Sequence, residues 1–112
     1  NASTAGPTGQ ASTVPSRATT GAVDHLTTAL AMEFVKKPVR INAIAPGGID
    51  TALVHNFEIQ SDIEFDLMQP YTGFRGMSSA EQIAGLFAYM ASDEAANMHG
   101  SIVSADCGIT AG

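Results

Sequence analysis

The feature that most constrains this chain is the short apolar run of residues 39–45, which ends at Pro46-Gly47-Gly48. After Arg40, near its start, the run has one polar residue, Asn42, and it predicts a strand buried on both faces of a parallel sheet. The proline and glycines end the strand, so a loop begins at its carboxyl end. Ligands bind beyond this end of open parallel sheets, which makes residues 46–51 a ligand-facing candidate. An ordinary strand-to-helix turn is the alternative.

Composition indicates one small domain, because the chain has 112 residues of which 45% are apolar. The formal charge of -6 and the pI of about 4.7 argue against nucleic acid or an anionic membrane as the main partner. The single cysteine, Cys107, cannot form an internal disulfide, and no apolar run is long enough for a membrane span. We therefore expect a soluble protein in the cytoplasm.

The first helix is predicted over residues 17–37, where apolar residues recur at intervals of three and four. We expect Lys36 and Lys37 to complement the dipole at its C-terminus, and Pro38 to end it. The residues expected to form its buried face are Val23, Leu26, Leu30 and Phe34.

The second helix is predicted to begin after Ser78 or Ser79, either of which is a good N-cap. A last strand follows at residues 101–105. The turn after it contains Cys107, which we expect to be a buried structural thiol because no basic residue neighbours it in the sequence. The residues expected to form the buried stripe of this helix are Ile83, Leu86, Phe87 and Met90.

Four stretches of the sequence resemble the short-chain dehydrogenase/reductase family: GAVDHLTTALAME at residues 21–33, NAIAPGGIDT at 42–51, YMASDEA at 89–95 and GSIVSADCG at 100–108. They are similar to the active-site helix, the strand and loop beside the cofactor, the last helix and the last strand of that family. The resemblance covers the C-terminal half of the family only. Residues 1–112 would then be the C-terminal half of such a domain, and we expect a piece of a longer protein.

The resemblance implies an α/β fold, namely the C-terminal part of a doubly wound, Rossmann-like parallel sheet. We expect about three strands, near residues 1–4, 39–45 and 101–105, with flanking helices. Right-handed crossovers through the two helices would join them.

Three positions of the family's reaction centre fall in the first 20 residues. By the resemblance, Ser3 matches the serine that hydrogen-bonds the substrate carbonyl, Ser16 stands at the tyrosine position and Thr20 at the lysine position. The chain thereby lacks a phenol that donates a proton to the developing alkoxide and an ammonium that supports it. We expect this chain alone to be inactive. As an alternative to a catalytic Ser3, Ser3 and Thr4 can merely satisfy backbone groups at a strand end.

The loop after the central strand carries the cofactor-side match to the family. The resemblance implies that Pro46 and Gly47 lie against the nicotinamide, that the Ile49 backbone bonds its carboxamide, and that the Thr51 hydroxyl contacts the carboxamide or a phosphate. The cofactor would be NAD or NADP. No glycine-rich turn that follows a strand and opens a helix occurs in the sequence, so we expect the pyrophosphate to have no grip on this chain.

Residues 52–77 are interpreted as a substrate lid, because apolar and acidic residues alternate there and Pro70 and Gly73 interrupt any long helix. The alternative is a pair of peripheral helices. His55 is a weak catalytic candidate, and His25 is expected to be a surface or packing residue. No metal-ligand spacing is present.

Two functions follow as hypotheses. The first is an NAD(P)-dependent oxidoreductase that acts on a small-molecule carbonyl or alcohol. The second is a non-catalytic remnant that serves as a dimerising or partner-binding module. In both cases we expect a homo-oligomer, or tight association with the N-terminal half, because a sheet of three strands would leave an unpaired edge.

Overall fold

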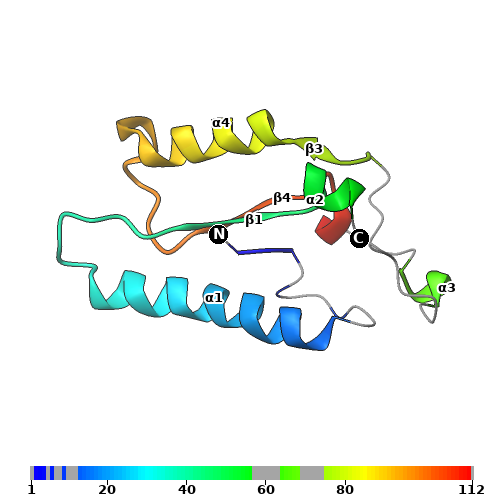
Figure 1. The fold of residues 1–112 in the computed structure, drawn as a ribbon. Coiled ribbons are helices and arrows are strands. Elements are labelled where there is room, and N and C mark those ends of the chain that lie inside the picture. The colour runs from blue at the N-terminus through cyan, green and yellow to red at the C-terminus, as the bar shows by residue number, and fades with distance from the viewer. Residues whose placement is uncertain are drawn as a thin grey trace.

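A computed structural model gives the architecture of the chain and describes residues 2–4, 6, 9, 13–56, 64–68 and 75–111 (Figure 1). Among the described helices, none has the length and hydrophobicity needed to cross a lipid bilayer. The regular elements, in chain order, are α1 (Val14–Glu33), β1 (Ala43–Pro46), β2 (Ile49–Asp50), α2 (Ala52–His55), α3 (Phe65–Met68), β3 (Ser78–Ser79), α4 (Ala80–Ala91), the short 3-10 helix η2 (Asp93–Ala95), β4 (Ile102–Ala105) and the 3-10 helix η3 (Ile109–Ala111).

The central strand is β1, which has a parallel neighbour on each side. It pairs with β4 in a register that runs from Ala43 opposite Ile102 to Pro46 opposite Ala105. On its other side lie residues 2–4, whose Ala2 amide donates to the Ile44 carbonyl at 2.8 Å. The predicted α/β arrangement of parallel segments is therefore confirmed, although residues 2–4 do not form a regular strand.

The predicted start of the central strand was too early. Regular pairing begins at Ala43 instead of residue 39, because the backbone before it bonds to a loop. The Ile41 amide donates to Nδ1 of His99, and the Ile41 carbonyl accepts from the Gly100 amide at 2.7 Å. The two hydrogen bonds of Ile41 thus fix the residues that lead into β4.

The two long helices cover opposite faces of the paired strands, so that β1 and β4 form the middle layer (Figure 1). Alternate side chains of a strand point to opposite faces. Ala43 and Ala45 lie in a cluster with Ala2, and Val23 of α1 packs against it. Ile44 is only 1% exposed and is the largest fully buried side chain among the described residues.

The buried face of α1 differs from the predicted one. Its buried residues are Thr27 and Ala31, whereas Leu26 is 55% exposed and Phe34 is 37% exposed. Small side chains fit here because the facing strands present alanines; a Cβ added at Gly100, ahead of β4, would lie 3.3 Å from Cβ of Ala31. The Thr27 hydroxyl is satisfied within the helix, donating to the Val23 carbonyl at 2.8 Å.

The end of α1 was also predicted too late. The helix stops at Glu33 and has no basic residue in its last turn, so Lys36 and Lys37 do not complement its dipole. The Phe34 amide donates to the Leu30 carbonyl, and the chain then turns before Pro38. The proline is therefore not what ends the helix.

The start of α4 confirms the predicted cap. Ser79 is the N-cap, its hydroxyl accepts from the Gln82 amide at 3.3 Å, and the Gln82 side chain accepts from the Ser79 amide at 2.9 Å. This reciprocal capping box satisfies two otherwise unpaired amides of the first turn. Ile83 and Met90 are buried as expected, whereas Phe87 is 46% exposed.

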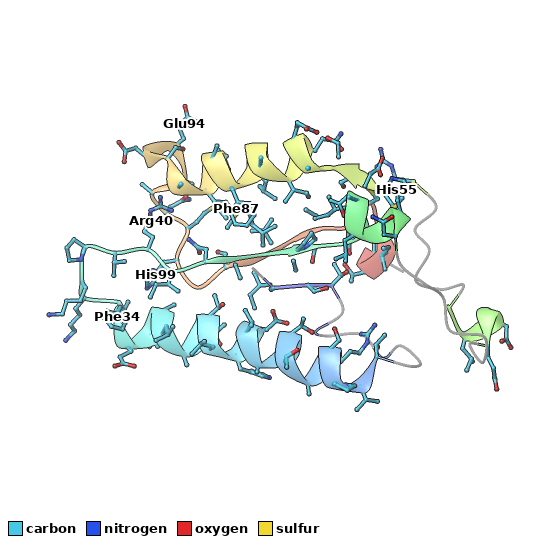
Figure 2. The ribbon with its side chains drawn as sticks, in the orientation of Figure 1. Phe34, Arg40, His55, Phe87, Glu94 and His99 are labelled. Atoms are coloured by element: carbon cyan, nitrogen blue, oxygen red, sulfur yellow. The ribbon has the colours of Figure 1, made fainter. Side chains whose placement is uncertain are left out.

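Arg40 fastens the far end of α4 to the segment that leads into β1 (Figure 2). Its guanidinium donates to three backbone carbonyls, those of Met90 at 2.8 Å, Ala95 at 3.0 Å and Ser92 at 3.0 Å. The last carbonyls of a helix have no partner within the helix. One planar side chain thus satisfies acceptors from α4, its C-cap and η2.

Two further side chains bridge the same end of the fold. Asn42 donates to the Met98 carbonyl and accepts from the Ser101 amide, both at 2.9 Å. Nδ1 of His99 accepts from the Ile41 amide, so Nε2 carries the hydrogen and donates to the Ala31 carbonyl at 2.7 Å. Asn42 and His99 together connect the start of β1 to the chain that precedes β4, and His99 connects that chain to α1.

Replacing Arg40 should destabilise the fold more than replacing an exposed cation. We expect Arg40→Ala to lower the free energy of unfolding by about 2 kcal/mol, because three carbonyls lose a charged donor. Arg40→Lys should give a free energy of unfolding between those of the unchanged chain and Arg40→Ala, since an ammonium lacks the planar fork of donors. Urea unfolding followed by circular dichroism measures this. Lys37→Ala, which removes the same charge from an exposed residue, is the matched control, and an equal loss in both variants would contradict the proposed role.

Candidate functional site

The candidate site lies where β1 and β4 end, at the carboxyl edge of the parallel strands. Residues 46–51 leave this edge from β1 and residues 106–108 leave it from β4. Residues 2–4 reach the same edge, because both the amide and the hydroxyl of Thr4 donate to the Pro46 carbonyl, at 3.3 and 3.2 Å. Three segments that are distant in sequence are thus joined at Pro46.

Gly47 is a glycine because the turn after β4 lies directly against it. A Cβ at this position would be 2.8 Å from Cα of Asp106 and 3.1 Å from its carbonyl oxygen, which are backbone atoms with little freedom to move. The Gly47 amide also donates to the Ala105 carbonyl at 3.1 Å. The close approach of the two loops therefore requires the absence of a side chain here.

Asp106 organises the turn after β4. The residue is 8% exposed. Its Oδ1 accepts from the Gly108 amide at 3.0 Å, and its Oδ2 accepts from the Thr110 amide at 3.0 Å and from the Thr110 hydroxyl at 2.6 Å. Burial by itself raises the pKa of Asp106, but these hydrogen bonds outweigh it and hold the pKa below its ordinary value.

The second half of the loop of residues 46–51 takes part in a second sheet of two short strands. Ile49 and Asp50 make up β2, which runs parallel to β3, and the Gly48 carbonyl accepts from the Ser78 amide at 2.9 Å. Thr51 follows as the N-cap of α2, yet its side chain makes no capping hydrogen bond. The Thr51 hydroxyl is therefore not used to begin that helix.

The first turns of α1 carry the two positions at which the resemblance places a tyrosine and a lysine. Ser16 is exposed and Thr20 is half-buried. The Thr20 hydroxyl donates back to the Ser16 carbonyl at 2.9 Å and lies 3.3 Å from the Arg17 carbonyl. Thr20 thus satisfies its own helix, as threonines inside helices commonly do.

Ser3 lies in the segment beside β1, immediately before Thr4. It is half-buried, and its carbonyl accepts from the Gly6 amide at 2.9 Å. The bonds from Thr4 to Pro46 place this segment at the same sheet edge as residues 46–51. The structure therefore brings the Ser3 segment and the cofactor-side loop together.

The segment predicted as a lid, residues 52–77, is described only in part. Its first residues form α2, and Nε2 of His55 lies 2.6 Å from Oδ1 of Asp50 (Figure 2). Both side chains are more than half exposed, so the pair is a surface interaction of little energetic value. Residues 57–63 and 69–74, which are half of the predicted lid, are outside the described residues.

Cys107 adopts a backbone conformation that favours glycine, with a φ of 55°. The residue is half-buried, and its sulfur lies 3.5 Å from the Ser78 hydroxyl oxygen. The expectation of a buried structural thiol therefore holds only in part. A weak contact between Sγ and Oγ links the turn after β4 to β3.

A family model described as enoyl-(acyl carrier protein) reductase, one of the short-chain dehydrogenase/reductase models, matches residues 2–110. The chain belongs to the short-chain dehydrogenase/reductase family. This confirms the resemblance seen in the four sequence motifs.

Two relatives within the short-chain family are named as dehydrogenases. Galactitol 2-dehydrogenase of Rhizobium johnstonii is 36% identical over 89 residues, which are 80% of this chain and 34% of that protein. Cis-4-hydroxycyclohexanecarboxylate dehydrogenase of Sinomonas cyclohexanicum is 32% identical over 106 residues, 95% of this chain and 41% of that protein. The chain thus spans well under half the length of these two curated relatives.

Solved structures of short-chain dehydrogenases agree with the fold. A 4-hydroxyisoleucine dehydrogenase mutant complexed with NADH and succinate is 30% identical, with a TM-score of 0.82 over 99% of this chain and 45% of that one. The parallel layer with a helix on each face is therefore the arrangement of the matching part of that enzyme.

Sequence reasoning found the loop but missed the residues that hold it. Asp106 was predicted only as part of a turn, and the partner of Thr4, the Pro46 carbonyl, was not predicted. Their contacts with Gly47 and Pro46 join segments that are far apart in sequence, and no local pattern reports such contacts. The aspartate followed shortly by Gly108 and Thr110 is the one available signal, because this spacing permits side-chain-to-backbone bonds.

Acid should weaken the site edge through Asp106. Folding lowers the pKa of this carboxyl. The stabilisation that Asp106 contributes is therefore present in full at pH values above its unfolded pKa of about 4, and it is lost as the pH falls through the lower pKa of the folded state. We expect Asp106→Asn to cost about 1–3 kcal/mol at pH 7 and to flatten the pH dependence of unfolding below about pH 4. Urea unfolding across pH, with the exposed Asp93→Asn as control, measures both effects. A pH profile unchanged by Asp106→Asn would contradict this assignment.

Proposed function

We propose that the chain is the nicotinamide-side and substrate-side part of an NAD(P)-dependent oxidoreductase that interconverts a small alcohol and its carbonyl compound. The observation that carries the proposal is the loop of residues 46–51, pinned at the carboxyl edge of parallel strands beside the Ser3 segment. Ligands of open parallel sheets bind at this edge. The names of the relatives, which include a galactitol dehydrogenase, support the class of substrate.

The residues of the loop fit the nicotinamide end of such a cofactor. The glycines let the loop pack closely against its neighbours, Gly47 against Asp106 and Gly48 against Met77, and the backbone groups of the loop are what could hold the ring. The Thr51 hydroxyl is not spent on capping α2 and is able to bond a carboxamide. A bound nicotinamide supplies or accepts the hydride, and the role of the chain is to orient the ring and the substrate at this edge.

Proton transfer is the step for which this chain is poorly equipped. In the proposal, the Ser3 hydroxyl binds the substrate oxygen. The serine at position 16 is too weak an acid to protonate a developing alkoxide, and the Thr20 hydroxyl is engaged with the Ser16 carbonyl. The sequence also holds no glycine-rich turn for the pyrophosphate. We therefore propose that the isolated chain neither binds the cofactor measurably nor turns over substrate.

A cytoplasmic location and a homo-oligomeric state belong to the same proposal. The lid assignment of residues 52–77 also remains a proposal.

The loop assignment can be tested in a chimera in which residues 2–110 replace the matching part of the NADH-binding 4-hydroxyisoleucine dehydrogenase. We expect the fluorescence of NADH to increase when the chimera is added and to stay unchanged when the isolated chain is added. Within the chimera, Thr51→Val should raise the NADH dissociation constant roughly 2- to 10-fold, because one hydrogen bond is lost. Thr19→Val, which removes a hydroxyl from an exposed turn of α1, is the matched control.

Turnover in the same chimera separates binding from chemistry. Carbonyl reduction should be absent with Ser16 and Thr20 and should appear when both Ser16→Tyr and Thr20→Lys are introduced. Saturable NADH binding by the isolated chain would contradict the proposal. So would an equal change of the NADH dissociation constant in Thr51→Val and Thr19→Val.

A second candidate is a non-catalytic module that binds a further copy of itself. Large apolar side chains on both helices and on β4 favour it, since Leu26 is 55% exposed, Phe87 46% and Ile102 38%. Exposed apolar side chains on several elements are expected to be covered in solution. Sedimentation of the isolated chain at several concentrations should show a dimer or larger species. A monomer at every concentration that also binds no hydrophobic dye would exclude this candidate.

A further inference from the structure

His99 joins parts of the fold that are distant in sequence, and the proposed oxidoreductase function does not use it (Figure 2). The residue lies between η2 and β4 in the chain. Its Nδ1 is 3.2 Å from the Ile41 amide nitrogen, and its Nε2 is 2.7 Å from the Ala31 carbonyl oxygen. Both ring nitrogens are therefore engaged with backbone groups, one ahead of β1 and the other on α1.

These two contacts admit only one protonation state of the ring. A backbone amide can only donate, so Nδ1 must accept from Ile41 and carries no hydrogen. A carbonyl can only accept, so Nε2 must carry the hydrogen that it donates to Ala31. The native fold thus requires the neutral imidazole with its hydrogen on Nε2.

Protonation of the ring would break one contact and keep the other. The imidazolium has a hydrogen on each nitrogen, so Nε2 could still donate to the Ala31 carbonyl. At Nδ1 two N–H groups would face each other, and the half-buried Ile41 amide would lose its acceptor. Because Ile41 lies two residues before β1, the loss falls where the chain enters the central strand.

The charged side chains around the ring give no offsetting partner for an imidazolium. They come from the end of α1, the segment before β1 and the chain around η2, and they are Glu33, Lys36, Lys37, Arg40, Asp93 and Glu94. In the part of the chain that the structure describes, none of them forms an ion pair with His99. The guanidinium of Arg40 is held by three backbone carbonyls. A positive ring would therefore gain no carboxylate in exchange for the lost amide.

We propose that His99 is a pH-sensitive switch in the fold, which holds the segment before β1 while it is neutral and releases the Ile41 amide when it is protonated. The folded chain then binds fewer protons at this position than the unfolded chain does. Stability is therefore present in full above the range in which imidazoles titrate, and it falls as the pH decreases through that range. The switch lies at the opposite end of β1 from residues 46–51, so it is independent of the proposed oxidoreductase function.

Two NMR measurements on the unchanged chain test the switch without any substitution. At pH 7.5 the ¹⁵N chemical shifts of the imidazole should identify the form of His99 with its hydrogen on Nε2. Hydrogen exchange of the Ile41 amide should be measured at pH 7.5 and 5.5, relative to the exchange of an unfolded peptide at the same pH. We expect the protection of this amide to fall by up to about tenfold at the lower pH, because protonation removes its acceptor.

Urea unfolding at the same two pH values measures the effect on the whole fold. The equilibrium constant of unfolding should rise about tenfold from pH 7.5 to 5.5, as expected for an imidazole that titrates near about 6.5 only after unfolding. His99→Gln keeps a donor and an acceptor without a titrating group, so the rise should disappear. His25→Gln removes an exposed imidazole instead and should keep the rise. The His55–Asp50 pair is the same in all three chains, so its contribution cancels in the comparison.

Three results would overturn the proposal. A hydrogen on Nδ1 of His99 at pH 7.5 would mean that the ring does not accept from Ile41. Unchanged protection of the Ile41 amide between the two pH values would show that protonation leaves this contact intact. An equal rise of the unfolding constant in His99→Gln and in the unchanged chain would place the pH dependence elsewhere. If His99→Gln fails to fold, the two NMR measurements decide.

Discussion

The rest of the structure depends on the parallel pairing of β1, whose backbone must find partners on both sides. All four of its residues are buried, so an unpaired amide or carbonyl there would carry the full cost of desolvation. β4 supplies the partners on one side and residues 2–4 supply them on the other. The helices are then fastened to this layer by side chains, with Arg40 holding the end of α4 and His99 holding α1.

The candidate site inherits its geometry from that pairing. Because the three segments run parallel, their carboxyl ends meet at one edge, and the chain needs only short loops to bring its functional groups together there. The Pro46 carbonyl is held by Thr4, and Gly47 is packed against the backbone of Asp106. Neither loop can shift alone, so the position that we propose for a nicotinamide ring is fixed by the same contacts that close the fold. This is how a small chain can present a preformed binding edge.

The sequence predicted the features that are encoded locally. The capping box at Ser79 and the loop at Pro46 follow from patterns within a few residues of each other, whereas the parallel order of the segments was implied by the family resemblance. The buried face of α1 was predicted wrongly because hydrophobic spacing ranks Leu26 above Thr27, whereas the alanines of the facing strands admit only a close, small side chain. The Arg40, His99 and Asp106 contacts were not predictable, because each joins residues that only the folded chain brings together.

The pairing order of β1 also sets when the fold can form. Its neighbours come from residues 2–4 and from β4, with a 20-residue helix between β1 and the first of these and α4 between β1 and the second. Nearly all contacts of the sheet are thus non-local, and such a topology has a high contact order and folds slowly. On a ribosome, β1 would emerge with one edge still bare and would stay so until the chain had been made through residue 105. During that interval its unpaired N–H and C=O groups are a template for another strand, so this short segment is the part of the sheet most exposed to aggregation until β4 pairs with it.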